Sequence, residues 1–135
     1  MMDAKLRLEI EKRLDDLIED AQELIDETKV YKTLENRKPK EVEESQIRNL
    51  LEIASSVDSV KALEVFIQYQ MGRGKLPPDF GDRLIEKIKD LGEKSEEITR
   101  QRPQERKEVW LKMIRQYLGY MNRYFVYKRK EEGGS

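Results

Sequence analysis

Apolar residues near the start of the chain recur at steps of three and four, from about Asp3 to Leu34. Charged residues fill the positions between them, which is the pattern of an amphipathic helix. No proline or glycine interrupts this segment, so the pattern predicts one long N-terminal helix. Its apolar stripe consists of Leu6, Ile10, Leu14, Leu17, Ile18, Ala21, Leu24 and Ile25.

Four later segments show the same period, and residues that favour turns separate them. A linker with a proline covers residues 33–44, and a loop with two glycines and two prolines covers residues 72–78. Residues 93–102 are polar and either extend the fourth helix or form a loop. Five helices with short connections predict an all-α, antiparallel helical bundle with a long N-terminal helix. The later helices are expected from Ser45 to about Ser56, from about Asp58 to Gly72, from Asp79 to about Gly92, and from Pro103 to about Lys130.

Polar residues and a glycine mark the expected helix ends. Ser45 is expected to cap the second helix, because its hydroxyl accepts a free amide hydrogen of the first turn. Either Ser56 or Asp58 is expected to cap the third helix in the same way. Gly72 is expected to end that helix in the left-handed conformation, which glycine adopts without a steric cost.

The chain has 135 residues, of which 37% are hydrophobic and 41% charged. This length predicts a single helical domain over residues 1–132, and residues 133–135 are expected to be a flexible tail. The high charge content suits helices whose outer faces are solvated. The sequence contains no run of 18 apolar residues and no signal peptide, so we expect a cytoplasmic protein with no membrane partner.

The sequence contains neither cysteine nor histidine. It therefore offers no thiol nucleophile, no disulfide and no imidazole to act as a general base or zinc ligand. The carboxylate pairs of the first helix, such as Asp15-Asp16, are adjacent residues that do not converge on one helix face. We expect no catalytic residue, no metal and no cofactor.

Charge is distributed unevenly along a chain whose net charge is −1. Residues 1–30 carry ten acids and five bases, whereas residues 111–135 carry two acids and six bases. The chain thus has an acidic start and a basic end. A basic segment favours an anionic partner, and the acidic first helix would face solvent or a basic protein.

The segment Ser45-Gln46-Ile47-Arg48 is the first candidate for a binding motif. Arg48 would lie on the outer face of the helix, where a guanidinium binds a phosphate through two parallel hydrogen bonds. The alternative is an ordinary amphipathic helix with a solvated arginine.

The loop after Tyr69 is the second candidate, because Arg73 and Lys75 alternate there with two glycines. Glycine allows the backbone to approach a ligand closely, and the two bases could hold backbone phosphates. The glycine spacing of a P-loop is absent. The alternative is a helix end followed by a turn.

The last helix is the third candidate, since no acid occurs from Val109 to Lys130. Aromatic rings stack on unpaired bases while lysine and arginine neutralise phosphates. The alternative assigns part of the helix to the core and its basic end to the helix dipole. On this view Tyr117, Tyr124, Phe125 and Trp110 are core residues, and the exposed candidates are Tyr120, Arg123, Tyr127 and Lys128.

Two of these motifs together resemble a known family. Residues 45–51, Ser-Gln-Ile-Arg-Asn-Leu-Leu, are followed by an apolar helix that ends in Tyr69-Gln70-Met71-Gly72-Arg73, and then by a long aromatic helix. This order resembles the small α-helical subunit of type III CRISPR effector complexes, over roughly residues 42–128. The Csm branch (type III-A) is the closer match, and the Cmr small subunit is the second choice.

The resemblance implies a non-catalytic subunit that lies along the crRNA–target RNA duplex and contacts the other effector subunits in antiviral defence. Such subunits hold sugar and phosphate without reading sequence. Carried over to this chain, the motif positions for RNA binding are Gln46, Arg48 and Arg73. Charge placement adds Lys75, Arg123, Lys128 and Arg129. A shared clamp requires Arg48, Arg73 and the basic part of the last helix to lie on one face.

Two other hypotheses remain open. The chain could be a protein–protein adaptor without a nucleic-acid role, self-associating through the stripe from Leu6 to Ile25. It could also be a carboxylate-dependent metal enzyme, although it lacks the Glu-x-x-His pair of helical di-metal sites.

Overall fold

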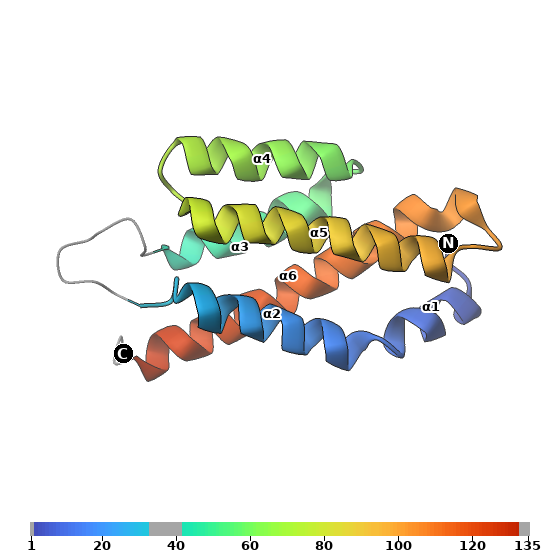
Figure 1. Cartoon of the computed structure of the whole chain (residues 1–135), viewed down its shortest axis with the longest axis horizontal. Helices are drawn as coiled ribbons and strands as arrows, with labels where there is room; N and C mark the ends of the chain where they lie inside the picture. The colour runs from blue at the N-terminus through green and yellow to red at the C-terminus, as the bar shows by residue number, and fades with distance from the viewer. Residues whose placement is uncertain (1, 33–41, 133–135) are drawn as a thin grey trace.

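The computed structural model describes residues 2–32 and 42–132, which form helices connected by turns and contain no strand (Figure 1). The prediction of an all-α bundle is confirmed, with six α-helices in this part of the chain instead of about five. The predicted tail at residues 133–135 and most of the predicted linker lie outside the described residues. The helices are α1 (Ala4–Glu11), α2 (Leu14–Thr28), α3 (Glu44–Ser56), α4 (Val60–Gly72), α5 (Pro78–Ile98) and α6 (Arg106–Glu131), and a 3-10 turn, η1 (Pro103–Glu105), precedes α6.

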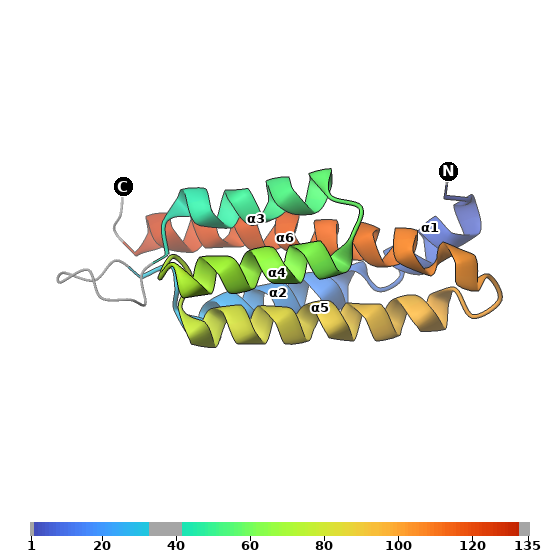
Figure 2. The same ribbon diagram turned by 90° about the horizontal axis from the view of Figure 1, so that it is seen from above.

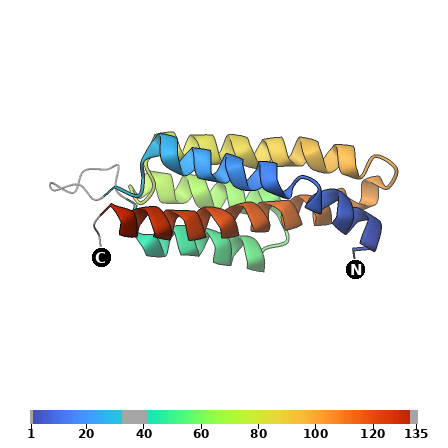
Figure 3. The same cartoon turned by 90° about the horizontal axis from the view of Figure 1, so that it is seen from below.

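Helix α6 is the centre of the bundle and contacts α2, α3 and α5 (Figures 1 and 3). The Tyr117 hydroxyl of α6 contacts Asp20 of α2, and Tyr124, further along α6, contacts Asp26, further along α2. The two helices are therefore parallel. The order is reversed on α3, because Arg115 contacts Ala54 at its C-terminal end. Successive helices from α3 to α6 are antiparallel, and α4 lies on the outside of α3 and α5 (Figure 2).

One apolar core runs through the bundle, and α6 contributes the largest share of it. Tyr117 and Phe125 are among the largest fully buried side chains. Burial in apolar surroundings raises the pKa of the Tyr117 hydroxyl far above its ordinary value. The other buried residues of this helix are Val109, Leu111, Met113, Ile114, Leu118 and Met121.

The prediction of one long N-terminal helix is wrong, because the chain turns at Lys12-Arg13 and forms α1 and α2 instead. The amide of Arg13 donates to the carbonyl of Ile10, and its guanidinium takes the carbonyl of Glu9 at 2.8 Å. These hydrogen bonds replace the regular i to i−4 backbone hydrogen bonds of a continuous helix. No proline or glycine marks the break in the sequence. The packing of two short helices against one core decides where the break lies.

The apolar stripe of this region does not project beyond the bundle, as a partner-binding helix would. Leu6 and Ile10 are at most 5% exposed, and Leu24 and Ile25 are fully buried against the rest of the monomer. Burial of these residues in one chain leaves less of the stripe for the proposed self-association, which stays a prediction.

Three predicted caps differ from the structure. Glu43 occupies the N-cap of α3 and Ser45 lies inside its first turn, because buried Val42 fixes where the chain enters the helix. Ser59 caps α4 instead of Ser56 or Asp58, and its hydroxyl accepts the amide of Ala62 at 3.0 Å. Helix α4 does end at Gly72, but the left-handed residue is Gly74, with φ of 76°.

Helix α5 continues through Gly92 to Ile98, so residues 93–98 extend the fourth predicted helix and do not form a loop. Gly92 allows Trp110 of α6 to lie directly on the α5 backbone, where its indole Nε1 donates to the carbonyl of Ile88 at 2.8 Å. Arg106 covers the same ring with its guanidinium 4.9 Å from the centroid. Trp110 thus joins the packing of α5 and α6, as the core alternative predicted.

Replacing Gly92 with alanine is expected to destabilise the fold by about 1–2 kcal/mol. A Cβ there would lie 2.7 Å from Cζ2 of Trp110, and moving the rigid ring costs more than the ~1 kcal/mol that alanine gains in a helix. Urea unfolding measures the loss, and emission of the only tryptophan reports the displaced ring.

Gly119→Ala is the matched control, because a Cβ at this glycine of α6 meets nothing within 4 Å. This variant should be as stable as the original chain or slightly more stable. Equal stability of the two variants would contradict the close packing of Trp110 on Gly92.

Candidate nucleic-acid interface

The elements that carry the predicted RNA-binding residues meet at one end of the bundle. The start of α3, the turn after α4 and the C-terminal end of α6 all lie at this end (Figures 1 and 2). The tertiary structure therefore brings together motifs that are up to about eighty residues apart in the sequence. They do not all share a face, however, because α6 presents some of them toward α3 and others toward α2.

Gln46 and Arg48 lie in the first turns of α3. Gln46 is half-buried, and Arg48 is exposed. Arg48 lies one turn before Leu51, the α3 residue that lines a hollow beside α6.

Arg73 and Lys75 lie in the tight turn between α4 and α5. Arg73 is exposed, with its guanidinium 5.4 Å from the ring centroid of Tyr69 and its NH1 3.4 Å from the Gln70 amide oxygen. Lys75 is half-buried, and its amide donates to the Gln70 carbonyl at 2.9 Å. The left-handed Gly74 between them turns the backbone so that this basic pair follows the end of α4.

A surface hollow of about 400 Å³ lies where α3 packs beside α6 and is named the α3–α6 groove here. Leu51 forms the α3 side. Helix α6 supplies Lys112, Arg115, Gln116, Gly119, Tyr120 and Arg123. Among the described residues that line the groove there are three cations and no acid, so it is a favourable place for an anionic polymer.

Two arginines of the groove are held differently. Arg115 donates to the carbonyls of Ala54 at 2.7 Å and Val57 at 3.2 Å, so it joins the end of α3 to α6. Arg123 is exposed and lies over the ring of Tyr120, with 4.9 Å between the guanidinium and the centroid. Arg115 therefore shapes the groove, and Arg123 is free to contact a ligand through its outer edge.

Lys128 faces the α2 side of α6, away from the groove. Its ammonium lies 5.1 Å from the ring centroid of Tyr31, 3.9 Å from the Asp26 carboxylate and 3.3 Å from Glu131. The hydrogen bond to Glu131 raises the pKa of Lys128, and bonds from Tyr127 and Lys128 lower the pKa of Glu131. Nearby carboxylates thus partly neutralise this lysine.

Tyr124, predicted to be a core residue, is only half-buried, and its hydroxyl donates to the Asp26 carboxylate at 2.8 Å. Partial burial, together with this bond, raises the pKa of the Tyr124 hydroxyl. The same flank of α6 that carries Lys128 therefore also carries an acidic partner from α2. This makes the α2 flank a poorer anion site than the α3 flank.

Arg129 points inward to the backbone. Its guanidinium donates to the carbonyl oxygens of Tyr31, Val30 and Val42, the last two at 3.3 and 2.6 Å. All three residues are buried, and the Val30 carbonyl also accepts the amide of Val42 at 3.3 Å, so the carbonyls of Tyr31 and Val42 depend most on this arginine. The contacts assign Arg129 a structural role, which the charge pattern of the sequence did not predict.

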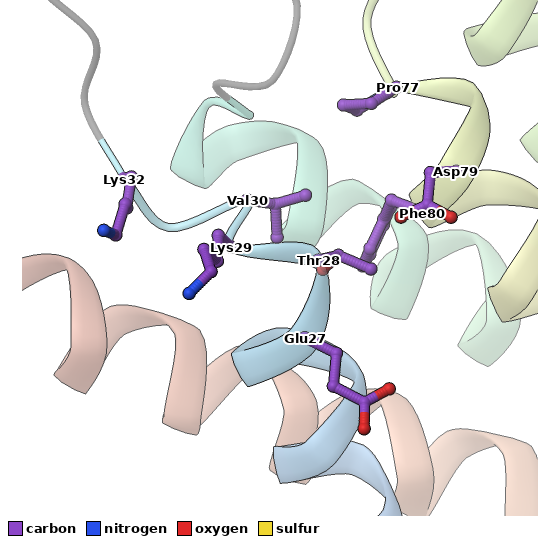
Figure 4. Close-up of a pocket in the computed structure, with 8 residues that line it drawn as sticks. All are labelled: Glu27, Thr28, Lys29, Val30, Lys32, Pro77, Asp79 and Phe80. Carbon is purple, nitrogen blue, oxygen red and sulfur yellow. The ribbon is translucent and has the colours of Figure 1, made fainter.

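A second hollow, of about 320 Å³, lies at the same end between the C-terminus of α2 and the start of α5 (Figure 4). Glu27 and Asp79 border it together with Lys29 and Lys32, and Phe80 closes its inner side. The mixture of charges gives this hollow no preference for an anion or a cation.

Sequence reasoning did not select Lys112 and Arg115 as site residues. They fall on one stripe of α6 with Gly119 and Arg123, at helical steps of three and four, which was a detectable signal. No sequence pattern revealed that α3 leaves this stripe partly uncovered. Nor did one reveal that Arg115 donates to backbone carbonyls at the C-terminal end of α3.

Fold and site together define an all-α bundle with a basic groove beside its central helix. In residues 2–32 and 42–132, no group of three or more acidic side chains is arranged to hold a metal ion. No helix of that same part has the length and apolar character to cross a bilayer. Neither protein-family models, nor curated proteins, nor solved structures match the chain.

Proposed function

We propose that this chain is a non-catalytic RNA-binding subunit that holds the sugar–phosphate backbone without reading base sequence. The observation that carries the proposal is the α3–α6 groove. The described residues that line it include three cations and no acid. Phosphate contacts supply affinity independently of sequence, which is what such a surface offers.

The proposed contacts are the exposed cations at and near this groove. Arg123 and Lys112 line it from α6, and the exposed Arg48 lies one turn before Leu51 on α3. Arg73 and Lys75 provide a second set at the same end of the bundle. Arg129 is not among the proposed contacts, because its guanidinium serves buried carbonyls.

The resemblance to the small subunit of type III CRISPR effector complexes suggests the particular setting. There the chain would hold the crRNA and its target RNA beside other effector subunits. The support is the order of the Gln46, Arg48 and Arg73 motifs and their meeting at one end of a helical bundle. A guide-directed complex accepts any target sequence, so backbone contacts suit this role.

Arg48→Ala combined with Arg73→Ala is expected to weaken RNA binding and its salt dependence. Each lost phosphate contact removes a slope of about 0.7–0.9 in log affinity against log salt, so the double variant should lose roughly 1.4–1.8. Fluorescence anisotropy with labelled single-stranded RNA and an RNA duplex, at several salt concentrations, measures the change.

Lys89→Ala with Lys94→Ala is the matched control, because it removes two exposed cations from α5 and changes the net charge equally. The control should keep the original slope. If both double variants lose affinity equally, net charge alone explains the binding and the proposed surface is wrong. If the unaltered chain fails to bind RNA at low salt, an adaptor role replaces RNA binding.

A further inference from the structure

The α3–α6 groove has a feature that phosphate binding does not require. Besides its cations and the amide of Gln116, it is lined by Leu51, the bare backbone of Gly119 and the ring of Tyr120. A surface that holds only phosphates needs no such recess. An aromatic and apolar surface with cations beside it fits a nucleobase together with the phosphates on either side.

The aromatic wall of the groove is organised before a ligand arrives. The guanidinium of Arg123 lies 4.9 Å from the centroid of the Tyr120 ring and restricts the orientation of both side chains. Arg115, held by the carbonyls of Ala54 and Val57, fixes the distance between α3 and α6 at the other end. A site formed in advance loses less conformational entropy when it binds.

Gly119 keeps the groove open. A Cβ built on Gly119 would meet no atom within 4 Å, so the glycine is not required for packing inside the protein. It lies one position before Tyr120 in the middle of α6, where glycine weakens a helix relative to alanine. The space that this residue leaves is available to a ligand.

We propose that the α3–α6 groove seats one unpaired nucleobase of a single-stranded RNA against the stacked pair of Tyr120 and Arg123, while Lys112 and the exposed Arg48 hold the flanking phosphates. This inference rests on the proposed function and adds a preference for unpaired RNA to it. A paired base has its faces covered by its neighbours in the helix, so a duplex binds through its backbone alone. Stacking on tyrosine tolerates every base, so the preference does not depend on sequence.

The test compares two fluorescent oligomers of equal length and charge, an oligouridine and an abasic ribose-phosphate chain. The unaltered protein should bind the oligouridine on the order of tenfold more tightly, because only that oligomer offers a base to stack. Tyr120→Leu should remove this difference and leave the affinity for the abasic chain unchanged. Gly119→Leu should also remove it, because its side chain fills the groove.

Ala62→Leu is the matched control, since it places the same side chain on an exposed position of α4 and should keep the tenfold preference. Thermal unfolding checks that Gly119→Leu is folded, which the open space at its Cβ favours.

Equal affinity of the unaltered protein for the two oligomers, with salt-sensitive binding of both, would overturn the base site but not the proposed function. A preference that survives Gly119→Leu would overturn the base site as well. If neither oligomer binds at low salt, both the base site and the proposed function are wrong.

Discussion

Arg129→Met is expected to lower the free energy of unfolding by about 2–3 kcal/mol. The substitution keeps an aliphatic chain over Phe125 but removes the donor of the Tyr31 and Val42 carbonyls, while the Val30 carbonyl keeps the amide of Val42. Each unpaired buried carbonyl costs about 1 kcal/mol or more. Since whole domains are stable by only about 5–15 kcal/mol, this loss should be plain in a urea titration.

Lys130→Met is the matched control, because it removes the same charge from the next residue of α6, whose side chain is exposed. Its effect should stay within about 0.5 kcal/mol. Equal losses in the two variants would mean that Arg129 acts through its charge at the helix end and not through its carbonyl contacts. Arg129→Met should also retain RNA affinity, in contrast to variants of the α3–α6 groove.

Leu24→Ala is expected to destabilise the chain by about 2–5 kcal/mol, because the fully buried side chain of Leu24 leaves a cavity in the core. The loss should be the same at low and high protein concentration, since the stripe is buried within one chain. Urea unfolding at two concentrations that differ by about a hundredfold measures both quantities.

Leu8→Ala provides the comparison for Leu24, since Leu8 lies in the same N-terminal region and is 55% exposed. Its effect should remain below about 0.5 kcal/mol. An unfolding midpoint that rises with protein concentration would contradict a monomeric core and support a dimer formed through the N-terminal stripe.

The helical period predicted most of the elements because burial of one face imposes it directly on the residue order. Ile47, Leu50 and Ala54 of α3 are buried, and so are Leu84 and Ile88 of α5. Helix ends were predicted less well. Several serines and acids near a boundary can act as caps, and the residue that does so depends on where buried neighbours such as Val42 hold the chain.

The candidate site was predicted in part. Exposed Arg48, Arg73 and Arg123 were identified from their positions on helix faces and at a helix end. Arg129 was grouped with them because a sequence shows charge but not direction. Its partners lie 87 or more residues away, so only the folded chain brings them within reach.

The sequence by itself determined an all-α protein, the inward faces of its helices, the basic character of its last helix and the absence of cysteine and histidine chemistry. These properties are local, because they depend on residue types and on spacing within one helix. Only the tertiary structure decided the break at Lys12-Arg13, the burial of the N-terminal stripe, the role of Arg129 and the opening of the α3–α6 groove. These depend on how helices far apart in the chain share one core, and no local pattern records that arrangement.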